Sequence, residues 1–303
     1  MRKRRLAILG LLAAVVLGVV GLTIARNGME ENAAEKVFEF QLGKTMEATA
    51  NQTRLPLSGG NTNGLLDAGY MGFPDNAYGR YVEPGYELKL GPLFGIRFYS
   101  NTERYPDKKT DSVQITFDLD HITTPQQTYD YVYGLITQFQ RGKWKRYIPE
   151  ECPRLQGKSS ILNLEEIRAL SLPVAPELKN FIGLGCPIDA AYKPELDKWM
   201  PLAIAGELQY FWHDGHGKFA KLDIGLSEPN SDGTFVNQGV SSVRIDLEFE
   251  LEEAMLATKK WHLEDDLKKP WGARVAKVEI EKRRIRDVLE AMAVKRGEPL
   301  AER

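Results

Sequence analysis

An uninterrupted apolar run near the N-terminus limits what this chain can be more than any other feature of its sequence. The run covers residues 6–25, LAILGLLAAVVLGVVGLTIA, and contains no charged residue and a single hydroxyl side chain, that of Thr23. A helix rises 1.5 Å per residue, so about 20 residues span roughly 30 Å, the thickness of the hydrocarbon core of a bilayer. The sequence therefore predicts one transmembrane helix over residues 6–25.

Positive charge on one side of this run predicts its orientation. The sequence RKRR at residues 2–5 precedes it directly, and clustered Lys and Arg tend to stay on the cytoplasmic side of a bacterial inner membrane. We therefore expect residues 1–5 to be a cytoplasmic basic cap, residues 6–25 a signal anchor and residues 26–35 a polar spacer. The bulk of the chain would then lie in the periplasm.

Two alternatives remain open for the apolar run. A cleaved signal peptide usually has an apolar core of about 7–15 residues followed by a small-x-small site, whereas this run is longer and ends with Thr23-Ile24-Ala25. The second alternative is a buried helix of a soluble protein. No cysteine lies near the end of the run to accept a lipid. An anchor and a signal peptide deliver the rest of the chain to the same compartment.

The charge of the part beyond residue 26 argues against nucleic acid as a partner. The whole chain has 40 Lys and Arg residues and 42 Asp and Glu residues. Five of the basic residues lie within residues 1–26, so the remainder carries 35 basic and 42 acidic residues, a formal charge of −7. Nucleic-acid affinity depends on Lys and Arg that neutralise phosphates, whereas an acidic surface attracts a basic partner. We expect a protein partner, with a basic secreted enzyme as one candidate.

The two cysteines, Cys152 and Cys186, predict a disulfide bond. Both lie in the part that we expect to be exported, and a proline follows each directly. An even number of cysteines in an oxidising compartment favours a bridge. Neither cysteine has the CxxC pattern or the adjacent histidine that would indicate a reactive thiol. Closing a loop of roughly 35 residues would stabilise the protein by about 3–4 kcal/mol on the chain-entropy argument.

Residues 36–148 are predicted to form a first α/β half. Apolar and polar residues alternate in four stretches, which predicts strands with one buried face: residues 36–42, 86–90, 93–99 and 112–120. A helix is expected over residues 125–141, because Thr124-Pro125-Gln126-Gln127 has the capping-box pattern and Gly142 follows the last apolar position. A further strand is expected at residues 143–148.

The segment 56–85 is the candidate partner-binding loop. It contains seven glycines and the aromatic residues Tyr70, Phe73, Tyr78 and Tyr81. Glycine allows positive φ angles, and aromatic side chains supply contact area with few rotatable bonds. An irregular connection or a pair of hairpins is the alternative. The segment does not match the phosphate-binding pattern GxxxxGK[ST].

Residues 149–205 are expected to be a helical connector tied by the disulfide, because short helical patterns and prolines replace the strands there. Residues 206–303 are predicted to be a second α/β half. Alternating runs at residues 207–213 and 218–226 flank an Asp-Gly turn, which is a strong hairpin signal. A third alternating run covers residues 242–251, and an amphipathic helix is predicted over residues 274–295.

The predicted fold class is α+β, with a single transmembrane helix followed by an exported domain of mainly antiparallel sheets packed with helices. A local likeness suggests that this domain contains two related α/β halves. Ser112-Val113-Gln114-Ile115 resembles Ser242-Val243-Arg244-Ile245, and in both places a hairpin pattern precedes and helical sequence follows. A repeated amphipathic strand also arises by chance, so duplication stays one of two alternatives.

We find no sequence pattern of a catalytic site. GxSxG, HExxH and SxxK do not occur, so the common exported hydrolases lack their usual signatures. His213, Asp214 and His216 are too few ligands for a closed metal site and lie at a predicted hairpin tip. The other histidines, His121 and His262, have no partner in the sequence. We therefore expect no catalytic residue, no metal and no cofactor.

The predicted function is that of a non-catalytic, membrane-anchored periplasmic protein that binds a protein partner through a sheet surface or the aromatic segment. An immunity or inhibitor protein against a secreted antibacterial effector fits the expected address, size and acidity. An accessory subunit of an envelope complex fits the same features. The alternative from the enzyme class is a periplasmic hydrolase that acts on glycan or lipid.

Overall fold

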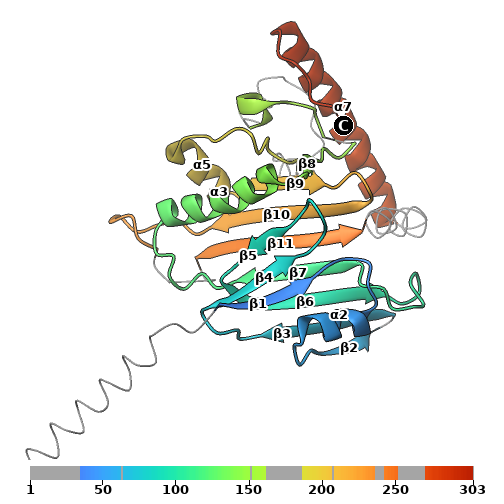
Figure 1. Cartoon of the computed structure of the whole chain (residues 1–303). Helices are drawn as coiled ribbons and strands as arrows, with labels where there is room; N and C mark the ends of the chain where they lie inside the picture. Colours follow the sequence, from blue (N-terminus) through green and yellow to red (C-terminus); the bar gives the residue numbers. More distant parts are fainter. Residues whose placement is uncertain are drawn as a thin grey trace, which may run out of the picture. The chain divides into compact units, whose positions relative to one another are not determined.

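The computed structural model describes residues 35–62, 64–150, 152–161, 186–206, 208–235, 242–251 and 270–302. Within them, one antiparallel sheet has eight strands in the order β2-β3-β6-β7-β11-β10-β9-β8 (Figure 1). The strands of this large sheet are β2 (Ser58–Thr62), β3 (Leu65–Met71), β6 (Leu93–Asn101), β7 (Ser112–Phe117), β8 (Lys145–Arg146), β9 (Leu208–His213), β10 (Lys218–Leu226) and β11 (Val243–Leu251).

The alternating sequence of each central strand sets which of its side chains are buried. In β11 the odd-numbered residues are buried and the even-numbered ones are exposed or half-buried. The partner strands keep this alternation in register, since Leu222 of β10 and Ile115 of β7 both lie opposite Leu247. The large sheet therefore has one apolar face and one polar face. Because β7 pairs with β11, the large sheet is continuous across both predicted halves.

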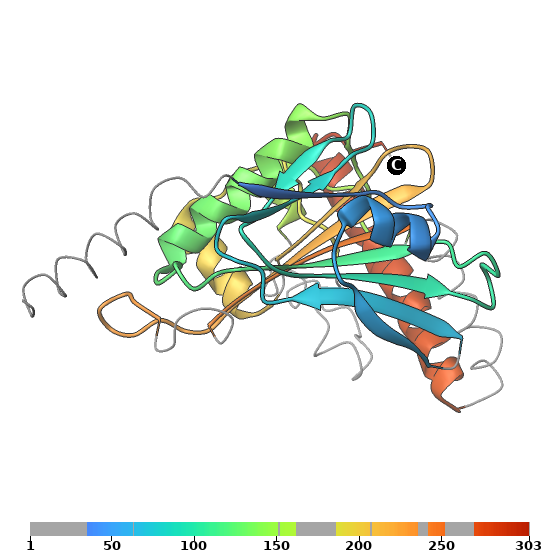
Figure 2. The same ribbon diagram turned by 60° about the horizontal axis from the view of Figure 1, so that its bottom comes forward.

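A second layer covers the apolar face. It consists of α3 (Pro125–Arg141), α5 (Leu196–Ile204) and a small sheet in the order β1-β4-β5 (Figures 1 and 2). The strands of the small sheet are β1 (Lys36–Phe40), β4 (Ala77–Tyr81) and β5 (Leu88–Leu90). The predicted α+β class, with mainly antiparallel sheets packed with helices, is confirmed.

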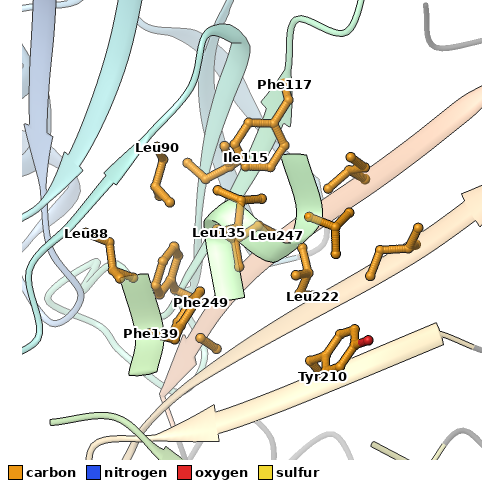
Figure 3. Close-up of a cluster of buried hydrophobic side chains, with 14 of the residues drawn as sticks. Leu88, Leu90, Ile115, Phe117, Leu135, Phe139, Tyr210, Leu222, Leu247 and Phe249 are labelled. Atoms are coloured by element: carbon orange, nitrogen blue, oxygen red, sulfur yellow. The ribbon is translucent and has the colours of Figure 1, made fainter. Parts of the chain in front are cut away.

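The core lies between these two layers. Figure 3 shows Leu135 and Phe139 of α3 among side chains of the large sheet, including Leu247 and Phe249. Phe139 stacks on Trp212 with ring centroids 3.9 Å apart. Trp199 of α5 is fully buried. The helices thus take their positions from apolar stripes that match the buried face of the sheet.

The predicted caps of α3 are present. Thr124 Oγ1 accepts a hydrogen bond from the backbone N–H of Gln127, and the Gln127 side chain accepts one from the backbone N–H of Thr124. Pro125 is the first helical residue, where its missing N–H has no intrahelical partner to lose. The sequence prediction for this helix is confirmed at both ends.

The disulfide Cys152–Cys186 is present, with the two Cα atoms 5.5 Å apart. Beside it, Arg146 donates hydrogen bonds to the carbonyl oxygens of Leu155 (2.7 Å) and Pro187 (3.0 Å). The short helix η1 (Gly157–Ser160) is held through Asp189, whose carboxylate accepts the Gly157 N–H at 2.7 Å. Covalent and hydrogen bonds therefore join the two chain segments that flank the undescribed residues 162–185.

The long C-terminal helix α7 (Pro270–Lys295) contacts this same region. Arg154 binds the carboxylate of Glu290 through its backbone N–H and its guanidinium, with the shortest contacts at 2.9 Å. Of the predicted apolar stripe, Ile285 and Leu289 are buried. The helix begins at Pro270, four residues before the expected start, because proline is favoured in the first turn of a helix.

Several predictions fall outside the described residues. These are the membrane span at residues 6–25 and the connector helices expected within residues 162–185. In the part of the chain that is described, no helix is long and apolar enough to cross a membrane. Residues 37–303 form one compact unit. The strand expected at residues 143–148 is wrong in length, since β8 has only two residues. The chain leaves the sheet after Arg146, whose side chain forms the hydrogen bonds described above.

Candidate partner-binding surface

The segment 56–85 is built largely of strands rather than a loop. It supplies β2 and β3, which pair as a hairpin, and β4 of the small sheet. Of the alternatives for this segment, the hairpin is therefore the one that the structure contains. The expectation of an exposed aromatic loop is wrong for Tyr81 and Phe73, which are 0% and 8% exposed. Tyr81 stacks on Phe249, and Phe73 contacts Tyr70, because the small sheet packs onto the apolar face of the large one.

The other two aromatic residues of this segment are half-buried. Tyr70 lies opposite Ile96 in β6, which places it on the apolar face of the large sheet. Tyr78 lies under the ammonium group of Lys89, 4.4 Å from the ring centroid. The four aromatic residues therefore do not form one exposed surface, and a role of Tyr70 or Tyr78 in binding stays a prediction.

The polar face of the large sheet, opposite α3, offers a broader surface, which we call the open face. It is formed by alternate residues of six neighbouring strands, β3, β6, β7, β11, β10 and β9. The polar residues on this face are Asp67, Arg97, Tyr99, Ser112, Gln114, Thr116, Arg244, Asp246, Glu248, Glu250, Lys221, Asp223 and Gln209. Arg97 and Arg244 are exposed, and the side chains of Lys221 and Asp246 are each 41% exposed. An antiparallel sheet with one solvated face shows this alternation.

One row of cross-strand neighbours runs through the middle of the open face. In order across the sheet it contains Phe211, Lys221, Glu248, Gln114 and Arg97. Neighbouring strands lie about 4.8 Å apart, so these five positions extend over roughly 19 Å. Residues from both predicted halves of the chain thus form one continuous row.

Local contacts use most of the positive charge of the open face. Lys221 Nζ lies 2.7 Å from Asp223 Oδ2, and Arg244 Nε lies 3.2 Å from Asp246 Oδ2. Glu248 accepts a hydrogen bond of 3.2 Å from Ser112. Within the described ranges, neither Glu248 nor Glu250 forms an ion pair with a Lys or Arg. Lys221 lies opposite Glu248 but pairs with Asp223, so the two carboxylates on adjacent outward positions of β11 have no ion-pair partner among the described residues.

The electrostatics of the open face reflect this shortage of positive charge. Burial, together with the nearby Glu248 carboxylate, raises the pKa of Glu250 to about 7, and Lys221 opposes the rise. Burial also raises the pKa of Asp246, with Arg244 opposing it and Asp223, which lies directly opposite in β10, adding to it. A cation brought to these carboxylates would lower their pKa values and gain attraction.

Apolar side chains lie at the β3 side of the same face. Leu65 and Met71 alternate with the apolar-face residues of β3 and are 45% and 48% exposed. The Met71 side chain extends over Gly95 of β6, where a Cβ atom would come within 2.1 Å of the Met71 sulfur. An apolar region beside charged groups is a common composition of protein interfaces.

The histidines are not gathered into a site. His213 lies in β9 with its ring stacked on Phe219, and His216 lies in the turn after it, where its backbone N–H binds the carboxylate of Asp214 at 2.6 Å. His121 contacts Tyr131. Across the described ranges, no group of three or more His, Cys, Asp or Glu side chains is placed to hold a metal ion. His262 lies outside the described residues.

No protein-family model, curated protein or solved structure matches this chain. The open face can dock a protein surface that carries Lys or Arg opposite β11 and apolar groups opposite β3. Sequence reasoning pointed to a sheet surface but not to this row, because the pairing of β7 with β11 joins residues more than 100 positions apart.

Proposed function

We propose that this protein is a non-catalytic, inner-membrane-anchored periplasmic protein that binds a basic protein partner through the open face. Within this class, the proposal is an immunity or inhibitor protein against a secreted antibacterial effector. One observation carries it: Glu248 and Glu250 occupy neighbouring half-buried outward positions of β11 and form no ion pair with a Lys or Arg of the described residues, and the pKa of Glu250 is raised to about 7.

These carboxylates can pair with a cation of a partner, because the nearest described cation, Lys221, pairs with Asp223. Antiparallel pairing holds β11 in the centre of the large sheet, so its outward side chains are fixed by backbone hydrogen bonds rather than by a loop. Such a surface loses little conformational entropy on binding. A Lys or Arg of a partner would restore the charge of Glu250, which couples binding to proton release.

The expected location in the periplasm fits a surface that binds a secreted enzyme. A tether at residues 6–25 would confine the protein to the periplasmic side of the inner membrane, where an enzyme delivered against the cell envelope acts. The charge of −7 beyond residue 26 favours fast association with a basic enzyme at low salt. An accessory subunit of an envelope complex would have the same address, and the identity of the partner separates the two.

The first test is recovery of the partner from cells. Tagged full-length protein would be solubilised from membranes in a neutral detergent and purified together with what it binds. The proposal expects one stoichiometric secreted enzyme that is toxic to cells lacking this protein and harmless to cells producing it. Recovery of no partner, together with turnover of cell-wall or lipid substrates by the purified protein, would instead favour the envelope hydrolase.

The second test places the interface on the open face. Glu248→Gln with Glu250→Gln should weaken partner binding at least tenfold, since charge-assisted contacts at an interface contribute about 1.5–3 kcal/mol. At pH 8, where most of Glu250 is ionised, Glu47→Gln with Glu228→Gln is the matched control, because it removes nearly the same net charge from exposed residues that are not on the open face. Equal loss of affinity in both double variants would show that only overall charge matters and would contradict the proposal.

We also propose that the two α/β halves are related. The strand order places β2, β3, β6 and β7 of the first half on one side of the β7–β11 contact and β11, β10 and β9 of the second half on the other, with the two-residue β8 of the first half added beside β9. The alignment of Ser112 with Ser242 pairs Thr116 with Asp246, and these two residues lie directly opposite each other in the sheet. A local two-fold axis through that pair would exchange the halves. Superposition of β6-β7 with α3 onto β10-β11 with α7 in a crystal structure tests this, and a different position of the two helices would contradict it.

A further inference from the structure

A cleft with a volume of about 360 Å³ lies where β10 begins and β11 ends. Four separate parts of the chain form it: the turn after β1 at residues 41–44, Lys109 before β7, the tip of the β9–β10 hairpin, and Leu251 at the end of β11. Among the described residues that line it there is no Asp or Glu, whereas three are lysines. In an acidic protein this is a local concentration of positive charge.

The lining residues are fixed by backbone and side-chain contacts. Gly43 adopts a φ of +85°, and its N–H binds the Thr110 carbonyl at 2.9 Å, so the turn lies directly against the start of β7. A Cβ atom on Gly43 would come 3.5 Å from Cε of Lys109, which shows that the lysine stem passes over this glycine. The buried carboxylate of Asp214 accepts the N–H groups of His216 (2.6 Å) and Lys218 (3.0 Å) and so holds the hairpin tip.

The lysines of the cleft differ in how their charge is used. Lys218 forms an ion pair with Glu83. Lys44 donates a hydrogen bond of 2.9 Å to the side-chain oxygen of Gln52, and the Lys109 ammonium lies 5.2 Å from the centroid of the Tyr105 ring. Both of these partners are neutral. Neither Lys44 nor Lys109 forms an ion pair within the described residues, although the charge of Lys109 also acts on the nearby Asp111 carboxylate. His216 lines the same space.

We propose that this cleft binds a phosphate group, carried either by a soluble phosphate ester or by the headgroup of an anionic lipid. Ammonium groups bind phosphate as point charges, and donors that approach from separate chain segments suit its tetrahedral oxygens. A carboxylate is better matched by the planar fork of Arg, and no Arg is among the described lining residues. The volume is within the range of small-ligand sites.

The binding test uses the full-length protein in a neutral detergent. Calorimetric titration with inorganic phosphate and with glycerol 3-phosphate, at an ionic strength held constant with chloride, should give saturable binding. Lys44→Gln with Lys109→Gln should weaken it by about tenfold or more. Lys158→Gln with Lys198→Gln is the matched control, since both lysines are exposed and do not line the cleft. Circular dichroism and the thermal midpoint establish that each variant is folded.

A second arm identifies the source of the phosphate group. Native mass spectrometry would compare retention of phosphatidylglycerol and phosphatidylcholine by the wild type and by the Lys44→Gln, Lys109→Gln variant. Loss of phosphatidylglycerol retention in that variant alone identifies a lipid headgroup, whereas saturable glycerol 3-phosphate binding without lipid retention identifies a soluble ester. Absence of both, equal binding by the variant and the wild type, or acetate binding as tight as phosphate binding would overturn the proposal.

Discussion

Tyr81 shows how strongly packing can change the role of an aromatic residue. Its ring is parallel to Phe249 at 4.7 Å and lies edge-on to Phe40 at 5.7 Å. Within the described structure its buried hydroxyl group has no hydrogen-bond partner, and burial together with Glu83 and Asp214 raises the pKa of Tyr81 far above its ordinary range. The ring therefore stabilises the core, while the hydroxyl group opposes this by its desolvation.

We expect Tyr81→Phe to leave the free energy of unfolding unchanged or to raise it by about 1 kcal/mol, since the variant removes an unsatisfied polar group. Tyr81→Ala should lower it by about 3–5 kcal/mol, because it removes the stacked ring and leaves a cavity. Urea unfolding measures both. A clear loss of stability in Tyr81→Phe would mean that the hydroxyl group does have a partner in solution.

Glu250 is the residue for which pH should matter most. Its folded-state pKa of about 7 lies above the ordinary value of 4.5, so the folded protein binds more protons than the unfolded chain between these two values. Stability contributed by the protonated carboxyl is thus fully present below about pH 4.5 and is lost as the pH rises through 7. The full difference corresponds to about 3 kcal/mol as an upper limit.

Glu250→Gln should accordingly be more stable than the wild type at pH 8, by about 1–3 kcal/mol, and equally stable near pH 4.5. Denaturant unfolding at intervals between pH 4.5 and pH 8 measures the difference. A difference that does not change with pH would show that the carboxyl of Glu250 titrates normally. The same variant should bind the partner more weakly. The Glu250 carboxylate would then lower the stability of the free protein at pH 8 and strengthen partner binding.

At the scale of elements, local sequence was sufficient where pattern and turn chemistry agreed. The β9–β10 hairpin and α3 were predicted closely, because alternation with an Asp-Gly turn and a capping box each specify one backbone geometry. Several elements were not predicted, among them α2 (Met46–Thr53) and β2. The helix α2 is short and polar, and β2 has the sequence SGGNT, so neither has a hydrophobic period. Both elements depend on tertiary contacts. One example is Gly59 of β2, which lies so close to the backbone of β3 that a side chain would not fit there.

The candidate site was less predictable than the fold. Alternation in residues 242–251 identified an outward face that carries Glu248 and Glu250. Which strand would lie beside it depended on long-range pairing that leaves no local signal. The burial of Phe73 and Tyr81 has the same origin, since nothing in residues 56–85 shows that β4 joins a separate sheet on top of the core.

The disulfide is the main covalent constraint on the elements between β8 and β9. Its sequence separation of 34 residues predicts a stabilisation of about 3–4 kcal/mol by loop closure. Cys152→Ser with Cys186→Ser should therefore unfold at a lower urea concentration than the oxidised wild type, and reduction with dithiothreitol should bring the wild type to the same midpoint. The double variant is its own control, because the reductant should not affect it. Equal midpoints for oxidised wild type and variant would contradict this expectation.

At the scale of the whole molecule, one sheet presents two sites of opposite charge. The open face carries Glu248 and Glu250 near the C-terminal end of β11, whereas the cleft beside Leu251 carries Lys44 and Lys109. A basic protein partner and a phosphate group would therefore use different residues.

The address of the molecule is testable on the intact chain. If residues 6–25 form an anchor, the protein should stay in the membrane pellet after an alkaline carbonate wash. Its mass should also show that residues 1–25 are still attached. Val16→Arg places a charge at the centre of the run, which disfavours insertion by about 3 kcal/mol, and should release protein into the soluble fraction or prevent export. Val294→Arg, at an exposed position of α7, is the matched control and should fractionate as the wild type does. A wild-type protein that is soluble in the periplasm and begins after Ala25 would replace the anchor by a cleaved signal peptide, while the disulfide and the open face would keep the same compartment.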